Sequence, residues 1–225
     1  MSRKQHRAAG VQPPDLAGVP LEHQASVELA PRAGYARQAW SNLRFDAQEA
    51  EDVSLEQLDV RGSSFSQASL PLVQLADCRF DTCDFAGCRL DKAYLRRVEL
   101  LGCRLVGVQI GDADLADVRF AHCNARMARY WSASLKQVRF EHCALQEASF
   151  DGSNLAGAVF WKCDLSGADF RNAKLRGADL RGSTIAGIRV ESKDLAGAII
   201  DPAQALELIQ HFGLVVRAED SAAEG

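Results

Sequence analysis

The chain has 225 residues, a hydrophobic fraction of 47% and a formal net charge of −4, from 26 basic and 30 acidic side chains. This length is enough for one domain with a buried core, and the near balance of charge excludes a global basic field of the kind that attracts nucleic acid. No stretch approaches the roughly 18 apolar residues that cross a bilayer, and no apolar segment follows the basic N-terminal residues as in a secretory signal, so we expect a cytoplasmic protein that binds neither membrane nor nucleic acid directly.

The N-terminal segment 1–40 lacks a regular pattern and contains prolines at positions 13, 14, 20 and 31. Proline removes a backbone donor and restricts the chain, so regular structure is disfavoured there. We predict a flexible N-terminal arm over 1–40, with residues 35–42 packing onto the start of the domain that follows.

A strict period of five begins at Phe45. Every fifth residue from there to Ile200 is apolar or aromatic, and the residue two positions earlier is always Ala, Val, Cys or Ser from Ala68 to Ala178. Such a period fits neither an α-helix nor a flat strand. It fits a chain that turns a corner in every unit and points both positions inward. Glycines cluster two residues after the large centre residue, where a corner favours positive φ.

Residues 20 apart also resemble each other, which indicates four units in each coil. Residues 118–123 read VRFAHC and residues 138–143 read VRFEHC. One column is unbroken leucine and another is cysteine; these are Leu55, Leu75, Leu95, Leu115, Leu135, Leu155, Leu175 and Leu195, and Cys83, Cys103, Cys123, Cys143 and Cys163. We predict about eight coils over residues 41–200.

The units across 163–182 read CDLSG, ADFRN, AKLRG and ADLRG. They resemble the pentapeptide-repeat family, whose unit is a small residue, Asp or Asn, Leu or Phe, and two variable residues. The resemblance implies an all-β fold, a right-handed quadrilateral β-helix. With coils about 4.8 Å apart, eight of them make a rod of roughly 40 Å.

A short helix and a tail are predicted over residues 201–225. Asp201 suits a helix N-cap, Pro202 suits the first turn and Gly213 suits the C-terminal end. The apolar residues exceed what a lid over the last coil requires, which favours a homodimer through this helix. Leu206, Ile209 and Phe212 are expected to cover the coil and the others to meet the partner, so the predicted dimer interface comprises Leu206, Leu208, Ile209, Phe212, Leu214, Val215 and Val216.

The tail also resembles one group within that family, the Qnr, MfpA, McbG and albicidin-resistance proteins. The matching segments are the Gln- and Leu-rich stretch 204–211 and the glycine with a branched run at 213–216. This resemblance implies that two rods pair end to end through the helices. It also implies a rod shaped and charged like duplex DNA, which binds type II DNA topoisomerase (gyrase) and confers resistance to a gyrase poison.

The residues that often carry chemistry are better explained structurally. All seven cysteines occupy the small inward position, so we interpret them as buried apolar residues rather than disulfides. His122 and His142 should point outward while the adjacent Cys123 and Cys143 point inward, so they cannot converge on one metal ion. We find no catalytic constellation and predict a protein that is not an enzyme, with no metal and no cofactor.

The outward residues of the face centred on 50, 70 and 90 carry eight acidic against five basic side chains, a net charge of −3. Trp131 is also outward there and could anchor a partner. The predicted partner-binding residues are Glu49, Glu51, Asp52, Asp91, Asp112, Asp151, Asp169, Glu191 and Trp131. Two functions stay open: topoisomerase protection by DNA-mimic-like binding, and a structural or regulatory scaffold for protein interactions.

Overall fold

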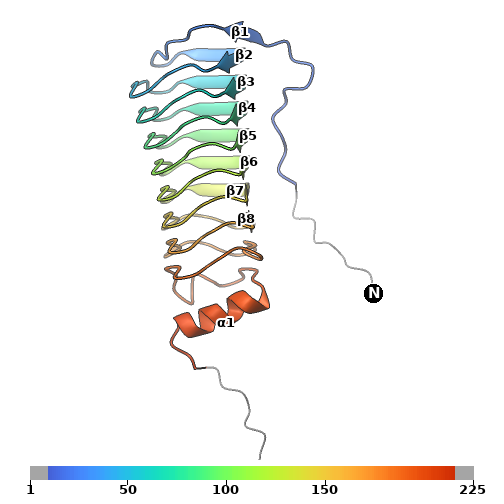
Figure 1. Cartoon of the computed structure of the whole chain (residues 1–225), viewed down its shortest axis with the longest axis vertical. Coiled ribbons are helices and arrows are strands. Elements are labelled where there is room, and N and C mark those ends of the chain that lie inside the picture. Colours follow the sequence, from blue (N-terminus) through green and yellow to red (C-terminus); the bar gives the residue numbers. More distant parts are fainter. Residues whose placement is uncertain (1–9, 216–225) are drawn as a thin grey trace, which may run out of the picture.

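The computed structural model describes residues 10–215 and shows a tower of stacked coils closed at one end by a helix (Figure 1). The strands form one parallel sheet in the order β1 to β8. The elements are β1 (Glu22–Gln24), β2 (Gly34–Ser41), β3 (Ser54–Arg61), β4 (Gln74–Asp81), β5 (Tyr94–Leu101), β6 (Asp114–Ala121), β7 (Ser134–Glu141), β8 (Val159–Trp161) and α1 (Pro202–His211).

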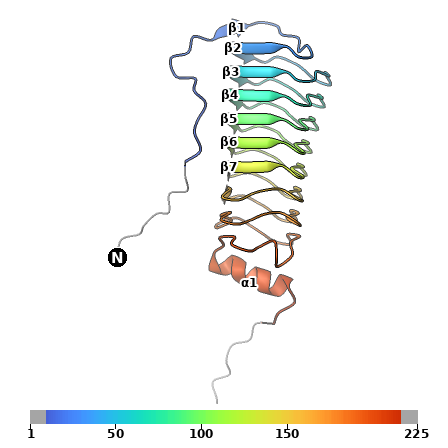
Figure 2. The ribbon, with the colours of Figure 1, turned by 180° about the vertical axis from the view of Figure 1, so that it is seen from behind.

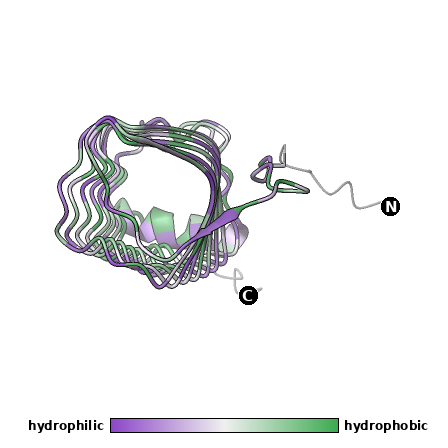
Figure 3. Cartoon of the chain, turned by 90° about the horizontal axis from the view of Figure 1, so that it is seen from above, coloured by the Kyte–Doolittle hydropathy of each residue, from purple (hydrophilic) through white to green (hydrophobic). Residues whose placement is uncertain are grey.

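The predicted repeat of four units is confirmed in the register of the sheet. Leu55 pairs with Leu75 and Leu95 pairs with Leu115, so identical positions of successive coils lie side by side. Seen along the axis, the coils superpose into one four-sided outline (Figure 3). The fold is the expected right-handed quadrilateral β-helix, in which each coil is hydrogen-bonded to the next.

Many corners are tight turns with a left-handed residue at the third position. The Ala68 N–H donates to the Phe65 carbonyl at 3.1 Å, and Gln67 between them has φ 58°. This is the geometry of a type II turn, which favours glycine at that position. Many corners hold other residues at a cost of about 1 kcal/mol each, a strain that the inter-coil hydrogen bonds outweigh.

The interior is filled by the centre residues and contains columns of stacked aromatic rings. Phe120, Phe140 and Phe160 form one column, with centroids 4.7 and 4.9 Å apart and interplanar angles of 7° and 5°. Tyr130 and Phe150 belong to a second column that meets the first edge-on. The stacking follows from the sequence, since residues of one type recur at the same position of successive coils.

The N-terminal part differs from the expected flexible arm within its described residues. β1 and β2 belong to the sheet, and Trp40 is fully buried at a centre position, in phase with the later repeats. Trp40 packs on Phe45 and closes the first coil. The sheet therefore begins before the predicted boundary at 41, because Tyr35 and Trp40 continue the five-residue period backward. Residues 1–9 of the arm lie outside the described residues.

Residues 10–21 run back along the outside of the coils (Figures 1 and 2). The Gln12 N–H donates to the Asp117 carboxylate at 3.1 Å, and the Asp15 N–H donates to the Asp77 carboxylate at 2.9 Å. The Gln57 amide donates to the Asp15 carbonyl at 3.3 Å. This segment is thus fastened to one corner column of the solenoid.

α1 closes the opposite end and is capped as expected. The Asp201 side chain accepts from the Ala203 and Gln204 N–H groups, and the Gln204 side chain accepts from the Asp201 N–H, which completes a capping box. Gly213, with φ 76°, follows the last turn. The predicted helix is confirmed.

The face of α1 that covers the coil is different from the expected one. Gln204 and Leu208 are buried, while Leu206 and Phe212 are exposed and Ile209 is half-buried. The Gln204 amide donates to the Leu180 and Ser183 carbonyls at 2.7 Å each. The end of a β-helix presents unpaired backbone carbonyls, so a polar donor on the covering face is favoured there.

Candidate interaction surface

The predicted acidic face comprises two columns of outward residues, which begin at Glu49 and Glu51, and the corner column that begins at Asp52. The column of Glu49 continues through Arg89, Arg129 and Asp169 to Arg189, with neighbours joined by backbone bridges, and is of mixed sign. The exposed carboxylates at the ends and middle of the face are those of Glu49, Glu51, Asp112, Asp151 and Glu191. The structure therefore gives an acidic surface that is interrupted by arginines.

Three of the predicted acidic residues are neutralised by ion pairs. Asp169 is only 4% exposed and lies 2.6 Å from Arg171 and 3.4 Å from Arg189. A hydrogen bond from Arg171 holds the pKa of the Asp169 carboxyl below its ordinary value, although burial opposes this. Asp91 pairs with Arg89 at 3.4 Å, and Glu191 pairs with Lys193 at 2.8 Å. Asp169 is thus a structural residue rather than a free contact.

Asp52 and Asp151 are also engaged, but by neutral groups. Asp52 is half-buried and accepts from the Gln74 amide at 3.1 Å, and Asp151 accepts from the Asn172 amide at 2.9 Å. Neither bond removes the negative charge. Both carboxylates remain able to interact with a basic partner.

Trp131 lies over a glycine of the preceding coil. A Cβ atom added to Gly111 would meet the Trp131 ring at 2.0 Å, so the ring fills the space that a side chain would occupy. This explains why Gly111 departs from the corner positions of the other glycines. Because Trp131 is half-buried by this packing, it presents less surface to a partner than its sequence position suggests.

The more exposed aromatic surface surrounds Trp161, which is 41% exposed. The His122 and His142 rings stack at 4.9 Å, and His142 meets Trp161 edge-on at 4.8 Å. The Lys162 ammonium lies 4.7 Å from the Trp161 ring centroid. The recurrence of histidine at positions 122 and 142 is the sequence signal that could have identified this row of stacked rings.

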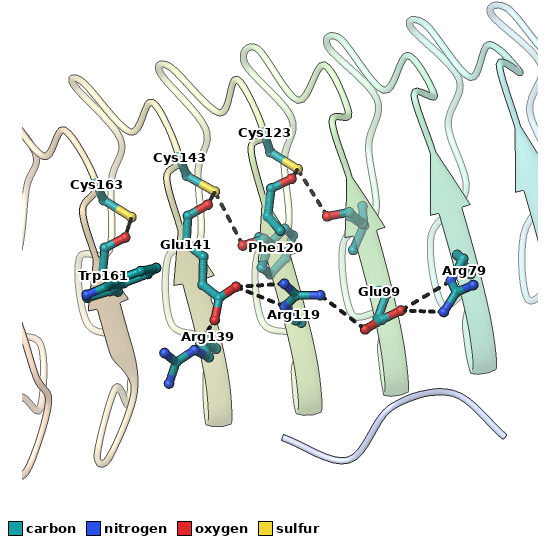
Figure 4. Close-up of polar contacts among 12 residues, drawn as sticks. Arg79, Glu99, Arg119, Phe120, Cys123, Arg139, Glu141, Cys143, Trp161 and Cys163 are labelled. Carbon is teal, nitrogen blue, oxygen red and sulfur yellow. Dashed lines mark hydrogen bonds and ion pairs between the residues drawn. The ribbon is translucent and has the colours of Figure 1, made fainter. Parts of the chain in front are cut away.

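A ladder of ion pairs crosses the sheet face (Figure 4). Glu99 lies 3.0 Å from Arg79 and 3.4 Å from Arg119, and Glu141 pairs with Arg119 at 2.8 Å and with Arg139. Burial alone would raise the pKa of the Glu141 carboxyl, but hydrogen bonds from Arg119 and Arg139 outweigh it and lower that pKa. Opposite charges at one position of successive coils, 79, 99 and 119, were the sequence signal that could have identified the ladder.

The C-terminal end carries an exposed apolar surface. Leu206 is 53% exposed, Phe212 41%, Leu214 61% and Val215 78%. Of the predicted dimer residues, Leu208 is instead buried between α1 and the core, and Val216 lies outside the described residues. The remaining residues gather around the end of α1 and the segment after it.

The cysteines lie in the interior as free thiols. Burial raises the pKa of Cys78 and of Cys88 to about 12 each. Along most of the cysteine column the thiol donates back to a carbonyl of the preceding coil, as Cys123 does to the Leu100 carbonyl at 3.3 Å (Figure 4). Buried thiols with raised pKa values are poor nucleophiles.

Within residues 10–215, no three His, Cys, Asp or Glu side chains gather in a way that could hold a metal ion. None of the helical structure described is both long and apolar enough to span a bilayer.

The repeats match two descriptions of one family. Residues 73–150 match the pentapeptide repeat region, and residues 133–172 and 143–182 match the family of pentapeptide repeats in 8 copies. No curated protein matches the chain.

Solved structures with a similar fold include HetL, a pentapeptide repeat protein involved in heterocyst differentiation regulation from the cyanobacterium Nostoc sp. strain PCC 7120. It is 20% identical, with a TM-score of 0.49, and the match covers 82% of this chain and 92% of HetL. QnrB1, a plasmid-mediated fluoroquinolone resistance protein, is 20% identical in one trypsin-treated form, with a TM-score of 0.45, covering 88% of this chain and 96% of that one. The four-unit coil and the family matches together show that residues 73–182 are pentapeptide repeats of this family.

Proposed function

We propose that this protein is a topoisomerase-protection protein, which binds DNA gyrase in the cytoplasm and counters a gyrase poison through its shape and surface rather than by catalysis. The observation that carries the proposal is a rod with short corners throughout, flanked by exposed carboxylates and ending in an exposed apolar patch. The tail that resembles the Qnr and MfpA group forms that patch. Fluoroquinolone resistance, which the name of QnrB1 states for that protein, is the activity we propose to test here.

The carboxylates available to a basic partner are those that no cation neutralises. Asp112 and Asp151 are exposed, and within residues 10–215 neither forms an ion pair. Glu49 and Glu51 extend the same surface toward the N-terminal end. Charges on such a surface act mainly on the rate and specificity of association with a basic groove.

The proposal includes a homodimer joined through the C-terminal ends. Leu206, Phe212, Leu214 and Val215 are exposed, and a two-fold contact would bury each against its own copy. Leu208 is excluded from this contact because it already packs on the core. Two rods of roughly 40 Å would then extend over about 80 Å.

The test is gyrase supercoiling in the presence of a fluoroquinolone, with the protein titrated to molar excess. We expect the wild type to restore supercoiling and the D112N/D151N variant to lose most of this protection. The matched control is E56Q/E147Q, which removes two exposed carboxylates from other faces. Absence of rescue and of gyrase binding by the wild type would contradict the proposal, whereas equal losses in both variants would contradict only the assigned face.

Dimer formation is tested separately by light scattering after size exclusion. The F212E/L214E variant should be monomeric while the wild type is dimeric. L72E is the control, since Leu72 is an exposed apolar residue on the side of the rod. A wild-type monomer at tens of micromolar would remove the dimer.

A scaffold for protein interactions is the second candidate, and the internal ion pairs favour it. Asp91, Asp169 and Glu191 are all paired with cations, which weakens the likeness to DNA. Duplex DNA carries one unpaired negative charge for every ~1.7 Å of its axis. Partners unrelated to DNA topology, recovered together with a negative gyrase assay, would support this function.

A further inference from the structure

A groove of about 690 Å³ opens beside the last coils, on the face centred on Leu155 and Leu175. Its polar lining consists of Asn154, Asn172, Lys174, Arg176, Lys193 and Asp194. In Figure 1 this region lies between β8 and α1. None of these residues is among the predicted site residues or belongs to the exposed patch around α1.

The groove arises where residues 191–197 leave the regular path of the coil. Position 193 is the inward position that holds a small residue in the earlier repeats, but here it is Lys193, which is exposed. A lysine ammonium cannot enter the apolar core without a partner. The segment instead bulges, and Asp194 folds back, donating its N–H to the Glu191 carbonyl at 3.0 Å.

The bulge leaves backbone donors of the preceding coil without their usual acceptors. Leu135 and Leu155 donate to the carbonyls of residues one coil ahead at 2.9 and 3.0 Å. The equivalent N–H of Leu175 has no backbone or side-chain acceptor within residues 10–215. The Asn172 N–H likewise has none in that range, whereas Gly152, one coil earlier, donates to Arg171 at 3.1 Å.

The side chains around these donors are mainly cationic. Lys174 and Arg176 are exposed, and neither forms an ion pair within the described part of the chain. Lys193 pairs with Glu191 at 2.8 Å. The lining contains one carboxylate, that of Asp194, which is 7% exposed and accepts from the Glu191 N–H at 3.1 Å.

We propose that this groove binds the phosphate group of a phosphorylated small molecule. Free backbone N–H groups beside Lys and Arg are the donor set that recognises phosphate oxygens, because N–H donors satisfy the lone pairs and the cations balance the charge. The Leu175 and Asn172 N–H groups would donate to the phosphate, and Lys174 and Arg176 would neutralise it. The site is independent of the proposed topoisomerase activity.

Inorganic phosphate and pyrophosphate are the probes, titrated at constant ionic strength with calorimetry and amide NMR. We expect saturable binding with shifts of the Leu175 and Asn172 amide resonances. Since each charge-assisted hydrogen bond contributes about a tenfold factor or more, K174Q/R176Q should bind about 100-fold more weakly. The matched control K136Q/K162Q removes two exposed lysines outside the groove and should bind as the wild type does.

Three results would overturn the binding of phosphate in this groove, and a fourth would contradict the backbone donors. The first is equal affinity in K174Q/R176Q and the wild type. The second is an equal loss in the control variant, which would indicate nonspecific attraction to surface charge. The third is equal binding of succinate, a dicarboxylate, which would show that any dianion is accepted and would remove the phosphate assignment. Unshifted Leu175 and Asn172 resonances at saturation would contradict the proposed donors.

Discussion

Replacement of Phe140 by alanine tests whether the stacked rings stabilise the rod. Phe140 is fully buried and lies between Phe120 at 4.7 Å and Phe160 at 4.9 Å. Its edge contacts with Tyr130 and Phe150 are at 5.9 and 6.1 Å. The substitution removes a full ring from the centre of four aromatic neighbours.

The expected cost is about 4–5 kcal/mol, because loss of a buried phenylalanine costs about 3–5 kcal/mol and aromatic pairs add about 0.5–1.5 kcal/mol each without being additive. The upper part of the range applies because the hydrogen-bonded ladder on both sides prevents the coils from collapsing into the cavity. F140L should cost only about 1–2 kcal/mol, since leucine fills most of the volume and already occupies this column at Leu100 and Leu180.

The assay is urea unfolding followed by far-UV circular dichroism, with wild type, F140L and F140A compared at one temperature. A free energy of unfolding for F140A within about 1 kcal/mol of the wild-type value would contradict the stabilising role of the stacked rings. Equal destabilisation by F140L and F140A would contradict it too, because the expected difference between the two variants arises from the volume of the cavity that each leaves.

Three further outcomes are expected. Hydrogen bonds from Arg97 lower the pKa of Asp77, so the stabilisation from this pair is complete above the ordinary aspartate pKa of about 3.9 and is lost as the pH falls through the lower pKa of the folded state. D77N should therefore lower the free energy of unfolding by about 1.5–3 kcal/mol at pH 7, measured by urea unfolding, and by much less at pH 2. Q204A should leave two carbonyls at the end of the coil unpaired and raise hydrogen exchange of α1 by at least tenfold, with strands β3–β6 unaffected. G111A should displace the Trp131 ring and red-shift its fluorescence, and unchanged emission in a variant that leaves Trp131 as the reporter would contradict the packing.

The repeat could be predicted from the sequence because each coil of a solenoid contacts only the coils next to it. Every coil buries its own centre residues against identical positions in the next coil, so a linear period maps directly onto a spatial column. Leu55 and Leu75 could thus be paired without any structure. Asp201 and Pro202 identified the helix for a similar reason, because capping depends on neighbouring residues alone.

Charge pairing was partly readable and was missed. Asp169 was predicted to be a partner-binding carboxylate, although Arg171 lies two positions along the chain and Arg189 lies one coil further on. The net charge of a face does not show which of its acidic and basic side chains lie close enough to form ion pairs. The ladder of Arg79, Glu99 and Arg119 shows that equivalent positions of adjacent coils must be examined as neighbours.

The coil, its inward residues and its corners could be predicted from the amino-acid sequence, since each follows from a pattern that repeats within five or twenty residues. The C-terminal helix could be predicted as well, since its capping residues are neighbours in the chain. Three features became visible in the folded molecule alone: the face of α1 that covers the last coil, the position of the N-terminal segment and the bulge of residues 191–197 at Lys193. These depend on unpaired backbone groups at the end of the stack and on contacts between segments such as Asp15 and Asp77, which have no periodic signature. The Leu175 N–H, which has no acceptor within residues 10–215, likewise has no periodic signature, because its missing partner results from the path of the next coil rather than from its own repeat.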